Sequence, residues 1–181
     1  MSLPIDVIPF FSGLSATDLM SIMAIAKTQK TEKDVNLFDQ GDKPDGLYVL
    51  LSGKLQVYIR SGFIGGTSKV LATLNPGQYV GEFGLIDGEP RSASVNVIEG
   101  GEILFIPAVA FGAILEQKPH IADKVCDFLC DKVMSLPKLK LTPDEAILIK
   151  EKRVQPTLSN MKYLCKIVRE HNKLTAIKDR G

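Results

Sequence analysis

Between Val35 and Pro107 apolar residues alternate with polar ones, and this period of two constrains the fold more than any other feature. Leu55, Val57 and Ile59 alternate with polar neighbours, and residues 93–97 repeat the pattern. Such alternation is typical of half-buried β-strands. Turn-forming residues recur at intervals of about eight to twelve positions, as in sandwiches and barrels: Gly41-Asp42, Pro44-Asp45-Gly46, Ser52-Gly53, Gly65-Gly66, Asn75-Pro76-Gly77, Gly88 and Gly100-Gly101. The segment therefore predicts about eight short strands that close into a β-roll.

Helical periodicity flanks this segment on both sides. Ser15 and Asp18 form a capping pattern before an apolar stripe, which predicts a helix that runs to about Thr28. After Pro107 we expect further helices, with these approximate bounds: a short one around residues 109–115, one from His120 to Leu136, one that starts at Thr142-Pro143-Asp144-Glu145, and one from Thr157 to His171. The fold class is α+β and mainly β: an eight-stranded β-roll or jelly roll with an N-terminal helix and C-terminal helices.

Pro137 interrupts the helical pattern and suggests a division of the chain. We expect residues 1–136 to form one unit of N-terminal helix, β-roll and post-roll helix, and residues 137–181 to form a helical extension. The apolar band of the post-roll helix is wider than one core-facing stripe, and Cys126 and Cys130 lie on its second side. That side either belongs to the core or covers a ligand or partner.

Composition excludes several classes of function. The net charge of +1 provides no general attraction to nucleic acid or to an anionic membrane. No segment reads as a signal peptide or as a membrane span, and the three cysteines suit a reduced compartment, so we expect a cytoplasmic protein. The two histidines, His120 and His171, lie outside the predicted roll, so no cupin-like metal site and no cofactor is expected. The sequence shows no Ser–His–Asp, Cys–His or Walker-type arrangement, so we do not expect an enzyme.

The segment GEFGLIDGEPRSASV, residues 81–95, carries the chemistry of a candidate site. If residues 82–87 form one helical turn, its first N–H groups are free to bind an anion, and Gly81 lets the backbone approach a ligand closely. Arg91 adds a permanent cation and Ser92 a hydroxyl, both suited to a phosphate. Glu82 would repel phosphate and suits hydroxyl donors such as those of a sugar. The alternative is a partly exposed ion pair of Glu82 with Arg91.

The same segment resembles the phosphate-binding cassette of cyclic-nucleotide-binding domains. The resemblance extends over about residues 8–133 and includes the runs FDQGD, LYVLLSGKLQVY and LNPGQYV. It implies that Glu82 binds the ribose 2′-hydroxyl and that Arg91 binds the cyclic phosphate. Ser92 and backbone N–H groups near Phe83, Gly84 and Ala93 would complete the phosphate site, with Gly81 at its start. It also implies that the helix after the roll, about residues 120–136, swings over the ligand.

Two departures from the family affect the expected function. Bacterial transcription factors of this family continue into a winged helix-turn-helix of about seventy residues, but 45 residues follow Leu136 here and show no such pattern. This argues against nucleic acid as a partner. Leu136-Pro137 stands where the family has polar residues that contact the base, and Pro137 shortens the helix through which those factors dimerise.

We therefore expect a sensor of cyclic nucleotides, not an enzyme, that signals through the post-roll helix to an unknown protein partner or a homodimer, without membrane contact. Ser92 favours cyclic AMP over cyclic GMP, because in the family a threonine after the arginine tends to accompany cyclic GMP. The alternative is a related scaffold or dimerisation protein that no longer binds nucleotide.

Overall fold

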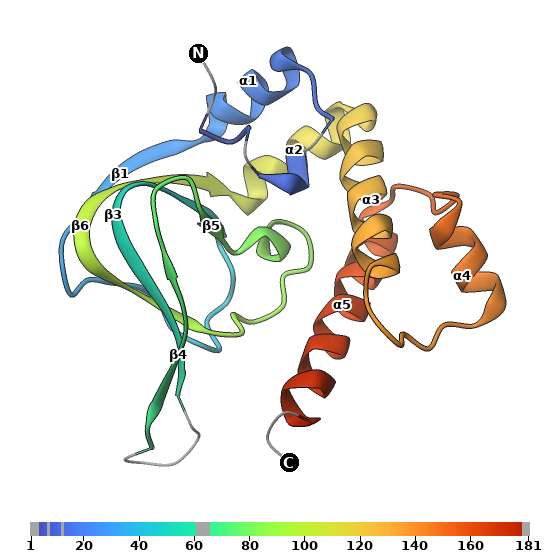
Figure 1. The fold of residues 1–181 in the computed structure, drawn as a ribbon. Coiled ribbons are helices and arrows are strands. Elements are labelled where there is room, and N and C mark those ends of the chain that lie inside the picture. The colour runs from blue at the N-terminus through green and yellow to red at the C-terminus, as the bar shows by residue number, and fades with distance from the viewer. Residues whose placement is uncertain (1–3, 7, 12, 61–65, 179–181) are drawn as a thin grey trace.

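Six antiparallel strands form one strongly bent sheet, with helices along one side (Figure 1). The computed structural model describes residues 4–6, 8–11, 13–60 and 66–178, with side chains as far as His171. The strands are β1 (Lys27–Thr31), β2 (Asn36–Phe38), β3 (Gly46–Arg60), β4 (Ser68–Leu74), β5 (Tyr79–Val80) and β6 (Ser94–Pro107). Their order in the sheet is β1-β6-β3-β4; β2 also pairs with β6, and β5 with β3.

The two long strands, β3 and β6, explain why the described part of the chain has six strands and not eight. Ser52-Gly53 and Gly100-Gly101, which the sequence predicts as turns, lie inside these strands, where the register of β3 against β6 shifts between Leu50 and Leu55. Gly53 has a φ of 90°, and a Cβ there would overlap the carbonyl group of Glu99. Bulges of this kind bend a strand without ending it. The predicted α+β class is confirmed, and the sheet is open and not a closed barrel. The predicted turn Gly65-Gly66 falls partly outside the described residues.

The α-helices and the turn after Gly81 lie where the sequence predicts them, with shifted ends, whereas the short turn η1 (Pro9–Phe11) was not predicted. The predicted elements are α1 (Ala16–Ile25), η2 (Glu82–Leu85), α2 (Ala108–Gln117), α3 (Pro119–Met134), α4 (Pro143–Lys150) and α5 (Leu158–Lys178). The end predicted for α1, near Thr28, is wrong because Lys27–Thr31 pairs with β6 as a strand. α4 begins at the expected Thr142-Pro143 start, where the structure adds a capping box between Thr142 and Glu145. α5 extends seven residues beyond the predicted His171.

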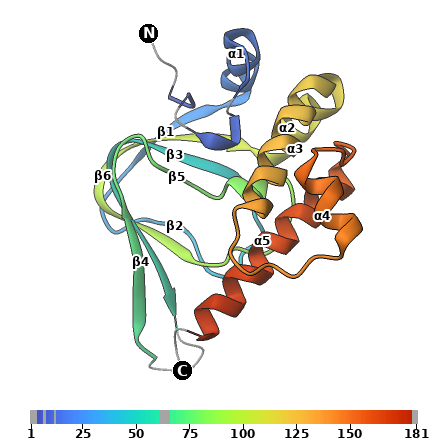
Figure 2. The same cartoon turned by 45° about the vertical axis from the view of Figure 1, so that its right-hand side comes forward.

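Two apolar clusters hold the structure together. One lies between the sheet and the helices; the other lies within the bend of the sheet and includes Phe38, Tyr48 and Leu55. The first cluster contains both sides of α3, so the band around Cys126 and Cys130 is core. It also contains the buried side chains of α5: Met161, Leu164, Cys165, Ile167 and Val168. The division at residue 136 remains a prediction. In the structure the extension shares its core with the preceding helices, and α5 packs against α3 (Figure 2).

Candidate functional site

The turn η2 opens the candidate site, as the sequence predicts. Gly81 precedes it with a φ of 91°, a conformation that side chains rarely adopt. A Cβ at position 81 would overlap Nη1 of Arg91, and a Cβ at Gly84 would lie 3.0 Å from the same atom. Glycine at both positions therefore allows the backbone of the turn to close around the guanidinium.

Arg91 is buried at the centre of this arrangement, with 6% of its surface exposed. Two backbone hydrogen bonds fix its position: its N–H donates to the carbonyl oxygen of Asp42, and its carbonyl oxygen accepts from the N–H of Gly41. Its guanidinium lies over the ring of Phe38, 4.2 Å from the centroid. Nε is buried and has no hydrogen-bond partner among the residues that the structure describes. A buried cation with an unused donor is suited to an anion.

Asp45 is the partner of Arg91 that the sequence did not reveal. Nη2 of Arg91 donates to Oδ1 of Asp45 at 2.8 Å and to the carbonyl oxygen of Gly46 at 2.8 Å. The hydroxyl of Tyr48 also donates to Asp45. Burial, together with the Asp45 charge, raises the pKa of Tyr48 to about 12, so this tyrosine stays a donor. The alternative of an ion pair between Arg91 and Glu82 is not what the structure shows, because Arg91 pairs with Asp45.

Glu82, the predicted hydroxyl acceptor, begins η2 and is partly buried. Burial raises the pKa of its carboxyl group, whereas the nearby charges of Lys132 on α3 and Arg169 on α5 lower it. The carboxylate thus lies in reach of positive charges from two helices that follow the sheet. Its pairing with a ligand hydroxyl remains a prediction.

The remaining predicted residues lie in η2 and directly after Arg91 in the chain. Phe83 lies within η2, and the guanidinium of Arg169 lies 5.6 Å from its ring centroid. Ser92 is exposed and Ala93 is buried beside the start of β6. The structure therefore brings Gly81, Gly84 and Arg91 into direct proximity and leaves the Ser92 hydroxyl accessible. Their roles toward a nucleotide remain predictions.

A second contact missed at the sequence level joins the cassette to α5. Asp87, at the end of the turn, pairs with Arg169. The two residues are 82 positions apart, and no pattern along the chain links an acid in a turn to a base in a distant helix. The sequence contains the acid, two residues after the turn, and the arginine, directly after the apolar Val168, but nothing in it marks the two as partners.

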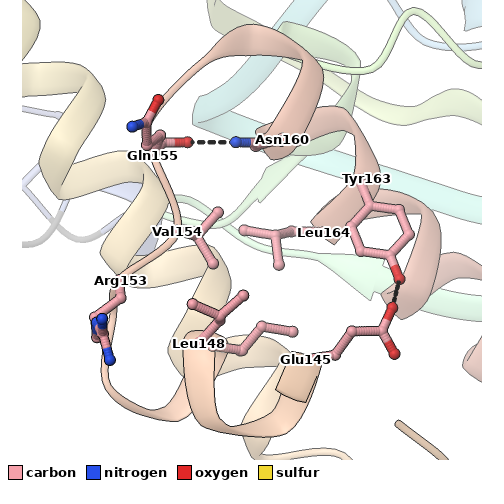
Figure 3. A pocket seen from close by; sticks show the side chains of 9 residues that line it. Glu145, Leu148, Arg153, Val154, Gln155, Asn160, Tyr163 and Leu164 are labelled. Carbon is pink, nitrogen blue, oxygen red and sulfur yellow. Dashed lines mark hydrogen bonds between the residues drawn. The ribbon is translucent and has the colours of Figure 1, made fainter. Parts of the chain in front are cut away.

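A separate hollow of about 300 Å³ lies between α4, residues 151–157 and α5 (Figure 3). Leu148, Val154 and Leu164 provide apolar walls. Its polar groups bind one another: the hydroxyl of Tyr163 donates to Glu145, and the side chain of Asn160 donates to the carbonyl oxygen of Gln155 at 3.0 Å. These bonds join α4, residues 151–157 and α5 to one another. Because they already pair these polar groups of the hollow, the cassette and not the hollow is the candidate site.

Within residues 4–6, 8–11, 13–60 and 66–178, no group of three or more His, Cys, Asp or Glu side chains is placed to hold a metal ion. In the same ranges no helix is both long and apolar enough to cross a membrane.

Comparison with known sequences agrees with this geometry. The model of the cyclic nucleotide-binding domain matches residues 28–118. The cyclic AMP receptor protein of Thermus thermophilus is 28% identical over 125 residues, which are 69% of this chain and 57% of the relative. A cAMP-dependent protein kinase regulatory subunit of Blumeria graminis is 29% identical over 113 residues, or 59% of this chain and 29% of that protein. The chain thus spans just over half of the first relative and under a third of the second.

Solved structures show the same fold. The N-terminal domain of a transcriptional regulator from Streptomyces coelicolor superposes with a TM-score of 0.69 at 22% identity, covering 78% of this chain and 99% of that one. The regulatory domain of Toxoplasma gondii PKA with cAMP gives 0.58 at 23% identity, covering 76% and 51%. Because the family model matches half of the chain and includes the turn, Arg91 and most of the sheet, this chain belongs to the cyclic nucleotide-binding domain family.

Proposed function

We propose that the chain is a regulatory module that binds a cyclic nucleotide, with cyclic AMP preferred over cyclic GMP. The observation that carries this proposal is Arg91: a buried guanidinium with an unused Nε, enclosed by the glycines of a turn. In this proposal Arg91, Ser92 and N–H groups near Phe83, Gly84 and Ala93 hold the phosphate. Glu82 accepts the ribose hydroxyl.

The proposed output is a shift between states of the helices that follow the sheet. A ligand changes such an equilibrium only by its difference in affinity for the two states. α3 packs on η1, α2, α4 and α5, so a movement at the cassette can reach the C-terminal helices through packed contacts. A protein partner or a second copy of the chain would read that movement. We propose no catalytic step, no nucleic-acid contact and a cytoplasmic location.

Isothermal titration of the full chain with cyclic AMP and cyclic GMP tests the proposal. We expect saturable binding, with cyclic AMP the tighter ligand, and a melting temperature that rises with nucleotide concentration. Arg91→Ala should abolish both effects because it removes the cation within the cassette. Arg60→Ala is the matched control, since it removes a guanidinium that is 61% exposed and pairs with Asp39. Absence of heat and of any melting shift at millimolar nucleotide would instead favour the scaffold that binds no nucleotide.

A further inference from the structure

The C-terminal helix α5 contacts the cassette through a two-pronged ion pair. Nε of Arg169 donates to Oδ2 of Asp87 at 2.5 Å, and Nη2 donates to Oδ1 at 3.2 Å. The side chains of Arg169 and Asp87 are 19% and 3% exposed. A bidentate pair with so little exposure is stronger and more directional than a surface ion pair.

Asp87 is also a part of the internal structure of the cassette. Its Oδ1 accepts a hydrogen bond from the N–H of Glu89 at 3.1 Å, and its own N–H donates to the carbonyl oxygen of Phe83 at 2.9 Å. The carboxylate therefore fixes the bend that leads from η2 to Arg91. Without a cation beside it, a carboxylate this deeply buried would either take up a proton or move toward water.

Arg169 lies close to other cassette residues as well. Its guanidinium lies 5.6 Å from the ring centroid of Phe83, and its charge acts on Glu82. The helix that bears it is anchored independently, because Leu164, Cys165 and Val168 are buried in the main core. The core thus fixes the position of Arg169, and Arg169 in turn fixes the position of Asp87 in the cassette.

We propose that Arg169 is a positioning residue for the cyclic-nucleotide site, acting through Asp87 on the bend that presents Arg91. This inference rests on the proposed function and goes beyond it, because it makes residues 158–178 part of the binding unit. Nucleotide affinity and the docking of α5 are then positively coupled. Since coupling is reciprocal, bound nucleotide strengthens the docking of α5 by the factor by which docking strengthens binding. α5, and not α3 alone, carries the state of the site to the C-terminal end of the chain.

The test measures nucleotide affinity and amide hydrogen exchange of α5 in the same full-length variants. Arg169→Gln is expected to raise the Kd for cyclic AMP by about tenfold, the order expected for one charged hydrogen-bonded contact. It is also expected to speed exchange in residues 158–178 without nucleotide. Lys166→Gln is the matched control: it removes the same charge from the same helix, at a side chain that is 67% exposed, and should change neither measurement.

Three further variants separate a positioning role from a general loss of structure. Asp87→Asn should weaken binding about as much as Arg169→Gln, and the double variant should lose much less than the product of the single losses, because the two act as one pair. Arg169→Lys keeps the charge without the fork and should give an intermediate Kd. If the losses of the single variants simply multiply, or if Arg169→Lys behaves as Arg169→Gln does while the wild type binds, the inference is wrong.

The outcomes also separate this inference from the proposed function. In the wild type, cyclic AMP should slow amide exchange in α5, and in Arg169→Gln it should not. A wild-type chain that binds no nucleotide would refute both the proposed function and the coupling. A wild-type chain that binds nucleotide with the same Kd as Arg169→Gln, and with unchanged exchange in α5, would refute the coupling alone.

Discussion

At the scale of single residues, the candidate site is defined by which groups contact each nitrogen of the Arg91 guanidinium. Arg91 is buried, and its Nη2 is engaged by Asp45 and the carbonyl oxygen of Gly46. Nε remains unpartnered among the described residues, and Nη1 faces the glycines of the turn. One edge of the guanidinium is therefore held by the protein. Nη1 is directed toward the backbone of the turn, where the proposed phosphate would lie.

The negative charge of Asp45 should weaken the binding of an anionic ligand to Arg91. Asp45→Asn keeps an oxygen that can accept from Arg91 and Tyr48 but removes a negative charge 2.8 Å from Nη2. Repulsion of the phosphate falls, so we expect the Kd for cyclic AMP to decrease by about three- to tenfold, measured by titration at low salt. The unfolding free energy should fall by about 1 kcal/mol, since Asp45 is 60% exposed and the asparagine oxygen still accepts from the buried Arg91.

Glu99→Gln provides the control for Asp45→Asn. It removes an acid that pairs with Lys54 and is 62% exposed, so it reports the effect of overall charge. Equal gains in both variants would mean that only net charge matters. A weaker affinity in Asp45→Asn would show that the carboxylate orients Arg91 and does not compete with the ligand.

At the scale of secondary-structure elements, sequence periodicity predicted the types of element well and some of their ends poorly. The period of two, the helix cap at Ser15 and the capping box at Thr142 are local signals, and the structure has all of them. Ser52-Gly53 misled because glycine serves turns and bulges alike, and only pairing with β6 decides between them. The contacts of Arg91 with Asp45 and of Arg169 with Asp87 were unpredictable for a similar reason: they depend on how the elements pack.

One contact between elements should make stability depend on pH. Asp18 in α1 accepts a hydrogen bond from Ser15 and lies 2.7 Å from Nε2 of His120 at the start of α3. The hydrogen bond with His120, aided by that from Ser15, lowers the pKa of Asp18 below its usual value. A lowered pKa in the folded state means that the stabilisation is present above the unfolded pKa. It is lost as the pH falls through the folded pKa.

Asp18→Asn should therefore flatten the acidic limb of the stability curve. Urea unfolding at about pH 7 should show a loss of about 1 kcal/mol for the variant. At a pH below the folded pKa, the wild type should lose that advantage and the two proteins should have similar unfolding free energies. A difference that stays constant over the whole range would show that the side chain acts through packing or capping and not through its charge.

At the scale of the whole molecule, the packing of the C-terminal extension predicts that it is needed for stability, in addition to the signalling role that we propose for it. The buried residues Leu164, Cys165 and Val168 share one core with Val125 and Leu129 of α3. Removing residues 137–181 would expose to water the side of α3 that packs against α4 and α5. Because burial of each large apolar side chain contributes about 1.5–3 kcal/mol, the loss is comparable with the total stability of an ordinary domain.

We therefore expect a chain truncated after Leu136 to melt at least about 10 °C below the full chain, or without a cooperative transition. Differential scanning calorimetry measures this directly. Leu164→Ala in the full chain is the matched smaller change, and should cost about 2–5 kcal/mol through the cavity it leaves. If the truncated chain aggregates or forms dimers, the newly exposed side of α3 accounts for it, so oligomeric state must be measured on the full chain. A truncated chain that melts cooperatively at the temperature of the full chain would show instead that residues 1–136 are an independent domain.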